Sequence, residues 1–79
     1  MKISVIVTLK KDVLDPQGKV VNQTLKNMGY NKIINVRQGK YFEIEINEND
    51  KNKANKIIKE ISEKLLANTI IEDFFIEQK

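Results

Sequence analysis

Two hydrophobic periods alternate along only 79 residues, and this alternation limits the chain to a small fold of mixed α and β structure. At the N-terminus, Ile3, Val5 and Val7 recur at every second position, which predicts a strand with one apolar face. Apolar residues then recur at spacings of three and four, which predicts helices at about 16–28 and 50–66. Strand and helix patterns therefore follow one another along the chain.

Both predicted helices are bounded by residues that favour helix ends. Asp15 is a good N-cap acid, Pro16 fits the first helical position, and Gly29 tolerates the left-handed conformation that ends a helix. The acids of the segment 47–50 are well placed at the start of the second helix. The apolar stripe of the second helix consists of Ala54, Ile57, Ile58, Ile61, Leu65 and Leu66.

The segment between the helices, residues 32–46, is predicted to be extended, because Phe42 and Ile44 continue a period of two. Gly39 lies in the middle of this segment, where a strand bends, bulges or turns. One long strand bent near Gly39 and a hairpin at that residue both fit the pattern, and we favour the bent strand. Residues 69–77 form the last predicted strand.

These elements predict an α+β fold with the order β-α-β-α-β. The chain is too short for a doubly wound parallel sheet, so we expect a two-layer sandwich. In this sandwich an antiparallel or mixed sheet of about three strands carries both helices on one face. No linker or low-complexity segment interrupts the sequence, and we expect residues 1–79 to form a single domain.

The second face of the predicted sheet is also partly apolar. Ile6 and Tyr41 have the parity opposite to the core residues of their strands, and Phe75 lies on the opposite side from Phe74. Apolar residues on both faces indicate that another chain covers the second face. We therefore expect an oligomer, which also adds the buried area that so small a domain lacks.

The sequence lacks the residues on which most enzyme sites depend. It has no cysteine and no histidine, which excludes thiolate and imidazole chemistry. The acid pairs Glu43 with Glu45 and Glu72 with Asp73 fit solvated strand positions better than a metal site. We therefore expect no catalytic residue, bound cofactor or metal in this chain.

Charge and hydropathy argue against two other classes of partner. The formal net charge is +3, Arg37 is the only arginine, and the lysines are spread along the whole chain. Nucleic-acid readers instead cluster basic residues on one face. No apolar run approaches the roughly 18 residues that a membrane span requires. We therefore expect a soluble cytoplasmic protein without a nucleic-acid or membrane partner.

Four short strings spread along the chain form a recognisable combination. They are Leu-Asp-Pro-Gln-Gly at 14–18, Val-Arg-Gln-Gly-Lys-Tyr at 36–41, Leu-Leu-Ala-Asn at 65–68 and Ile-Glu-Asp at 71–73. In this order and at this separation, the chain resembles the PurS family, the small subunit of phosphoribosylformylglycinamidine synthase. Each string alone is a weak signal, whereas the set covers nearly the whole length.

The resemblance implies a non-catalytic subunit of an enzyme complex in purine biosynthesis. The family's small subunit associates with itself as a dimer or tetramer, and it assembles with a PurL-type synthetase and a PurQ-type glutaminase. The complex, a carbon–nitrogen ligase, uses ATP, magnesium and glutamine, and the small subunit bridges the two large ones. It is expected to aid ammonia transfer, because ammonia released into neutral water becomes mostly ammonium and is lost as a nucleophile.

Assembly contacts are expected on the middle and last strands. Arginine and tyrosine are typical interface anchors, and the segment 37–41 unites them with a glycine and a lysine. A sheet bulge with solvated cations is the alternative interpretation of that segment. The predicted interface residues are Arg37, Lys40, Tyr41, Glu72, Asp73, Phe74 and Phe75.

Two positions depart from the usual family pattern, which commonly has proline at position 69 and tyrosine at position 74. This chain has Thr69 and Phe74 instead, so a hydrogen bond from a hydroxyl at position 74 is not carried over. Two functions outside the family also fit a small α+β chain: an RNA-binding module that stacks bases on Tyr41 and Phe75, and a regulatory module that binds an amino acid.

Overall fold

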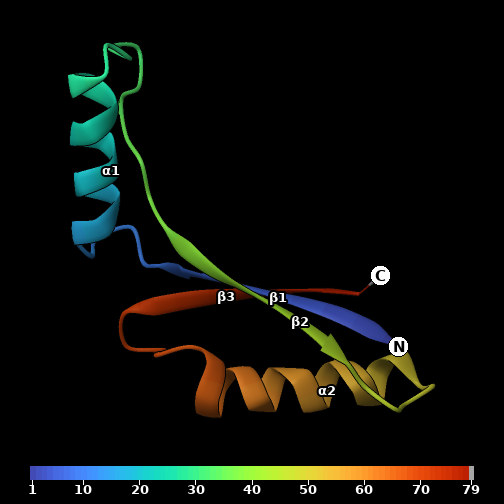
Figure 1. Cartoon of the computed structure of the whole chain (residues 1–79). Helices are drawn as coiled ribbons and strands as arrows, with labels where there is room; N and C mark the ends of the chain where they lie inside the picture. Colours follow the sequence, from blue (N-terminus) through green and yellow to red (C-terminus); the bar gives the residue numbers. More distant parts are fainter. Residues whose placement is uncertain (79) are drawn as a thin grey trace.

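The computed structural model describes residues 1–78 and contains one three-stranded antiparallel sheet in the order β2-β1-β3 (Figure 1). The elements in chain order are β1 (Lys2–Leu9), α1 (Pro16–Asn27), β2 (Gly39–Glu45), α2 (Lys51–Ile61), the π-helical turn η1 (Ser62–Leu66) and β3 (Glu72–Gln78). The α+β class and the order of elements predicted from the sequence are confirmed.

The core lies between the sheet and α2. Ile3, Val5 and Val7 of the central strand β1 are fully buried, as their period of two predicts. In the register, Val5 lies opposite Phe42 of β2 and Ile76 of β3, so both outer strands add apolar side chains to the same face. Burial of this one face is what aligns the three strands, because a slip by one residue would turn it outward.

The helix α2 covers this face of the sheet through a short apolar stripe. Asp50 caps its N-terminus, since its Oδ1 accepts hydrogen bonds from the amides of Asn52 at 2.9 Å and Lys53 at 3.3 Å. Ala54 and Ile58 are fully buried against β1. The helix then widens into the π-helical turn η1, where the Ala67 amide donates to the Ser62 carbonyl five residues earlier at 2.9 Å. The helical segment predicted at 50–66 is therefore confirmed as two successive elements.

The helix α1 is also bounded as predicted. Asp15 accepts a hydrogen bond from the Gly18 amide at 2.9 Å, and Pro16 takes the first helical position. At the other end Gly29 has a φ of 97°, a left-handed conformation that favours glycine. The Tyr30 amide reaches back to the Leu25 carbonyl at 2.9 Å and closes the helix.

The expectation that both helices lie on one face of the sheet is wrong. Figure 1 shows α1 projecting from one end of the sheet, with the returning segment beside it, while α2 alone covers the sheet. Val20 and Met28 of α1 are each 65% exposed, and Gly18 is its one buried residue. The radius of gyration is 16.0 Å, against about 12 Å for a compact chain of this length.

The expectation was wrong because an amphipathic pattern indicates that one side of a helix is buried, but it does not indicate which surface covers that side. α2 already covers the face of the sheet that carries the core residues, so no room remains there for a second helix. The loop 10–15 then leads α1 beyond the end of the sheet instead of across it (Figure 1).

The middle segment forms neither a single long strand nor a hairpin. Only Gly39–Glu45 joins the sheet, and residues 33–38 run beside α1 without pairing to another strand (Figure 1). The register explains the difference, because Thr8 pairs with Gly39 and β1 ends at Leu9, so earlier residues have no strand to pair with. The last strand starts at Glu72 for the same reason, since Glu72 pairs with Leu9.

Candidate functional site

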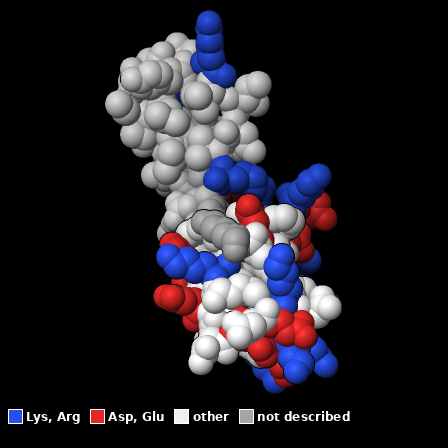
Figure 2. Space-filling view, turned by 90° about the vertical axis from the view of Figure 1, so that its right-hand side faces the viewer, with Lys and Arg blue, Asp and Glu red and all other residues white. Residues whose placement is uncertain are grey.

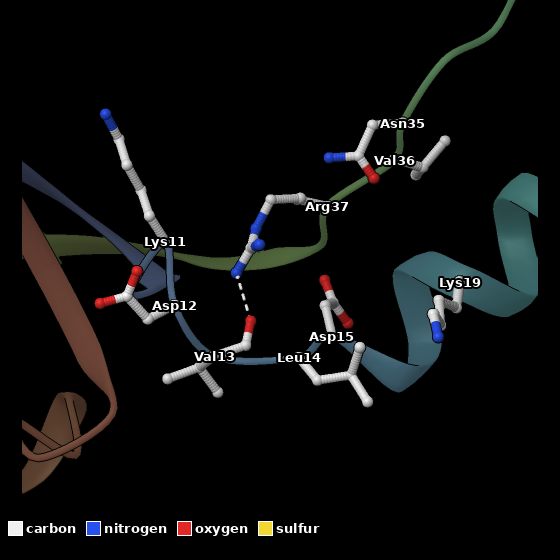
Figure 3. Close-up of a pocket in the computed structure, with 9 residues that line it drawn as sticks. All are labelled: Lys11, Asp12, Val13, Leu14, Asp15, Lys19, Asn35, Val36 and Arg37. Atoms are coloured by element: carbon white, nitrogen blue, oxygen red, sulfur yellow. Dashed lines mark hydrogen bonds between the residues drawn. The ribbon is translucent and has the colours of Figure 1, made fainter.

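Three parts of the molecule are useful in describing its surfaces. We call the sheet with α2 and η1 the body, and residues 16–35 the arm. Two connecting segments, residues 10–15 and 36–38, form the neck between them. Figure 3 shows side chains of both neck segments facing one another.

Asp15 binds the start of the arm and the returning segment of the neck. Its Oδ1 accepts the hydrogen bond of the Gly18 amide at the start of α1, and its Oδ2 accepts one from the Gln38 amide at 2.6 Å. The residue is only 8% exposed. The hydrogen bonds from Gln38 and then Gly18 lower the pKa of the Asp15 carboxyl below its ordinary value, because they stabilise the ionised form.

Arg37 makes the reciprocal connection. One guanidinium nitrogen, Nη2, donates hydrogen bonds to the Val13 carbonyl at 2.9 Å and the Lys10 carbonyl at 3.0 Å (Figure 3 shows the first). Arg37 was expected on the middle strand, but it lies two residues before β2 begins. Its guanidinium therefore contacts backbone atoms of its own chain.

The start of α1 also packs tightly against the returning segment. A Cβ atom placed on Gly18 would overlap the carbonyl oxygen of Val36. A residue without a side chain is therefore required where the helix meets this segment. Beside this contact lies an open cleft of about 270 Å³ that is lined by both acids and bases, among them Asp12, Lys19 and Arg37 (Figure 3).

Within residues 1–78, no three or more acidic, histidine or cysteine side chains come together as metal ligands. In that same range, no helix has the length and apolar character needed to cross a membrane. The contacts of Asp15 and Arg37 hold chain segments together.

A second surface lies on the face of the sheet opposite α2, which we call the open face. Ile6 of β1 pairs with Tyr41 of β2 on one side and with Phe75 of β3 on the other, so three apolar side chains form one row across the sheet. Tyr41 is 55% exposed and Phe75 is 62% exposed. The Tyr41 hydroxyl is hydrogen-bonded to that of Ser4 at 2.8 Å, and Ser4 itself is buried.

The remaining predicted interface residues are divided between surface ion pairs and the core. Asp73 forms a salt bridge with Lys10 at 2.6 Å, and Glu72 forms one with Lys40 at 3.5 Å. Phe74 packs against the core beneath α2, away from the open face. The structure thus brings Tyr41, Phe75 and Asp73 to one face of the sheet and places the other predicted residues elsewhere.

Sequence reasoning missed the dual function of Asp15 and the hydrogen bonds of Arg37. The pair Asp15-Pro16 signals a helix start, but no local pattern signals that the second carboxylate oxygen binds an amide 23 positions later. The role of Arg37, two residues before Gly39, was similarly ambiguous in the sequence. Only the fold, which returns the chain past its own helix start, brings these groups into contact.

The charged side chains form no single basic surface on the visible side of the body. Figure 2 shows lysine and arginine interspersed with aspartate and glutamate there. On the open face, Glu43 of β2 and Asp73 of β3 lie on the same side of the sheet as Tyr41 and Phe75. Nearby carboxylates disfavour nucleic-acid phosphates, so this surface is unsuited to the RNA-binding alternative.

A model of the family PurS, described as phosphoribosylformylglycinamidine (FGAM) synthase, matches residues 2–79 of the chain. The chain belongs to the PurS family. The PurS subunit of phosphoribosylformylglycinamidine synthase from Bacillus subtilis is 49% identical over 76 residues, which cover 96% of this chain and 89% of that one. The PurS subunit from Methanocaldococcus jannaschii is 34% identical and covers 96% of this chain and 92% of its own length.

Solved PurS structures share the fold over most of the chain. The Bacillus subtilis PurS structure superposes with a TM-score of 0.87 over 96% of this chain and 94% of that one. A chain of the PurLQS structure from Thermotoga maritima superposes with a TM-score of 0.90 at 27% identity, over 99% of this chain and 95% of that one. These likenesses confirm the PurS resemblance seen in the four strings.

Proposed function

We propose that this chain is the small, non-catalytic subunit of phosphoribosylformylglycinamidine synthase in purine biosynthesis. In this role it joins a PurL-type synthetase and a PurQ-type glutaminase. The observation that carries the proposal is the likeness, over 99% of the chain, to a chain of the PurLQS structure from Thermotoga maritima. The proposal takes residues 1–79 as one PurS-like domain, in line with the match over residues 2–79.

The surfaces of the molecule support an assembly role. The arm leaves Val20 and Met28 largely exposed, and the open face exposes Tyr41 and Phe75. A chain with a thin core and two exposed apolar regions gains buried area by associating with other chains. We propose that Tyr41 and Phe75 contact another subunit directly, whether a second copy or a partner.

The chemistry of the complex belongs to the partner subunits in this proposal. ATP, magnesium and glutamine are bound by the synthetase and the glutaminase, and this chain supplies docking surface that helps to keep ammonia out of water. Such a complex depends on abundant ATP and glutamine, so the proposal includes a cytoplasmic location. The net charge of +3 with both signs on the surface suits protein partners of mixed charge.

Reconstitution tests this function. The purified chain is expected to hydrolyse no glutamine and to form no product alone, and to restore glutamine-dependent product formation when added to the two large subunits. Phe75→Glu is expected to reduce this restoration, because it places a charge in the apolar row. Asn55→Glu adds the same charge on an exposed position of α2 and serves as the matched control. Failure of the wild-type chain to bind either large subunit or to restore activity would refute the proposal.

A further inference from the structure

The direction of the arm is not set by packing on the body. Among the described residues of α1 only Gly18 is buried, and its close neighbour is the carbonyl of Val36 in the neck rather than a side chain of the sheet. A helix that buries an apolar stripe is held by many contacts, whereas this one is attached at its first turn. The neck therefore decides where the rest of the arm points.

Two side chains cross-link the neck in opposite directions. The carboxylate of Asp15, on the outgoing segment, accepts the Gln38 amide of the returning segment at 2.6 Å. The guanidinium of Arg37, on the returning segment, donates to the Lys10 and Val13 carbonyls of the outgoing segment at 3.0 and 2.9 Å. Hydrogen bonds to charged groups are shorter and stronger than neutral ones, so these few bonds restrict the two segments strongly.

We propose that Asp15 and Arg37 form a clamp across the neck, and that they are positioning residues which set the direction of the arm for assembly. The consequence for assembly rests on the proposed function, whereas the clamp itself is a property of the isolated chain. This assigns Arg37 a role different from the partner contact that the sequence suggested. Its exposed side chain contributes to the geometry of its own chain.

The structure offers variants that separate the clamp from helix capping. In Asp15→Asn the amide oxygen still caps the Gly18 amide, but an NH2 group replaces the oxygen that faces the Gln38 amide. Asp50 provides the matched control, because a single oxygen accepts both of its hydrogen bonds from α2. Asp50→Asn therefore keeps both bonds. Arg37→Gln removes the two bonds from the guanidinium.

Distances between spin labels measure the direction of the arm. The chain has no cysteine, so cysteines introduced at Lys26 in α1 and Lys59 in α2 can be labelled specifically. The labelled chain is diluted with unlabelled wild type, so that only distances within one chain are observed. A second pair at Glu45 and Lys59 reports on the body alone.

Arg37→Gln and Asp15→Asn are expected to broaden the distance distribution between positions 26 and 59 at least about twofold, since rotation about the neck is no longer restricted. The distribution between positions 45 and 59 should stay unchanged, and so should both distributions in Asp50→Asn. Unaltered widths in both clamp variants would overturn the proposal. Broadening of the body pair as well would overturn it too, because the variants would then loosen the whole fold.

The same variants are then titrated onto the two large subunits. If the productive arm direction is populated about one tenth of the time, the apparent affinity falls about tenfold. Wild-type affinity in variants with a mobile arm would overturn the role in assembly. If the wild-type chain binds neither subunit, the proposed function fails, while the label distances still decide whether the clamp exists.

Discussion

The helices α1 and α2 begin alike and end in different environments. Each starts with an aspartate that caps its first turn, at Asp15 and at Asp50, and each carries an amphipathic pattern. α2 buries Ala54 and Ile58 completely, while α1 leaves Val20 largely exposed. The comparison shows that a helical pattern predicts the helix reliably, but it does not tell whether the apolar side meets the same chain or another one.

The largest expected effect is on the free energy of unfolding, and it should differ between the body and the arm when an isoleucine in each is replaced by alanine. Ile58→Ala should lower the free energy of unfolding by about 2–5 kcal/mol, because Ile58 is fully buried. Ile34→Ala deletes the same atoms from a residue that is 90% exposed in the arm, and should change it by no more than about 0.5 kcal/mol. Urea unfolding at low protein concentration measures both. Equal losses would show that the arm is packed as tightly within the chain as the body.

An intermediate effect is expected on association instead of folding. Val20→Glu places a charge on the exposed apolar side of α1 and should weaken self-association, because a charge is costly to bury in an interface. Its unfolding midpoint, measured on the dissociated chain, should be close to that of wild type, since glutamate favours helix more than valine does. Sedimentation velocity over a concentration series detects the change, with Asn55→Glu on α2 as the control. A Val20→Glu chain that sediments like wild type would mean that the arm is not an association surface.

The smallest effect is expected at the neck, which joins the two regions, and it depends on pH. The folded chain lowers the pKa of Asp15 below its ordinary value of 3.8. The ionised carboxylate therefore stabilises the fold at pH values above 3.8. This contribution should disappear as the pH falls below 3.8 towards the lower value of the folded state. The urea midpoints of wild type and Asp15→Asn should therefore differ near neutral pH, and this difference should become small in acid. A difference independent of pH would show that the charge of Asp15 is not involved.

Much of the fold follows from local patterns. The strand at Ile3 to Leu9, the cap at Asp15, a helix start with acids within 47–50 and the helix end at Gly29 were all predicted, because each depends on residues that are neighbours in the sequence. The prediction of one long strand over 32–46 was wrong in its first half, which does not join the sheet. A strand needs a neighbour to pair with, and the length of β1 sets how much of that segment can join the sheet.

The candidate site could be predicted only in part. Side-chain parity indicated that Tyr41 lies away from the core and that Phe74 and Phe75 lie on opposite faces of their strand. The structure places Tyr41 and Phe75 on one face with Ile6 between them. Parity could not reveal that Phe74 packs against the core beside α2 while Arg37 binds backbone carbonyls of the loop before α1. Those contacts join positions far apart in the chain, and no spacing rule reaches so far.

The order of amino acids was enough to specify the order of the elements, the ends of the helices and the absence of imidazole and thiol chemistry, because these depend on local geometry and side-chain identity. Where the arm points and which atoms hold it there emerged only from the folded chain. The contact between Asp15 and Gln38 exists because the backbone returns past the start of α1. Such a contact reflects the path of the whole chain and is therefore invisible to any local pattern.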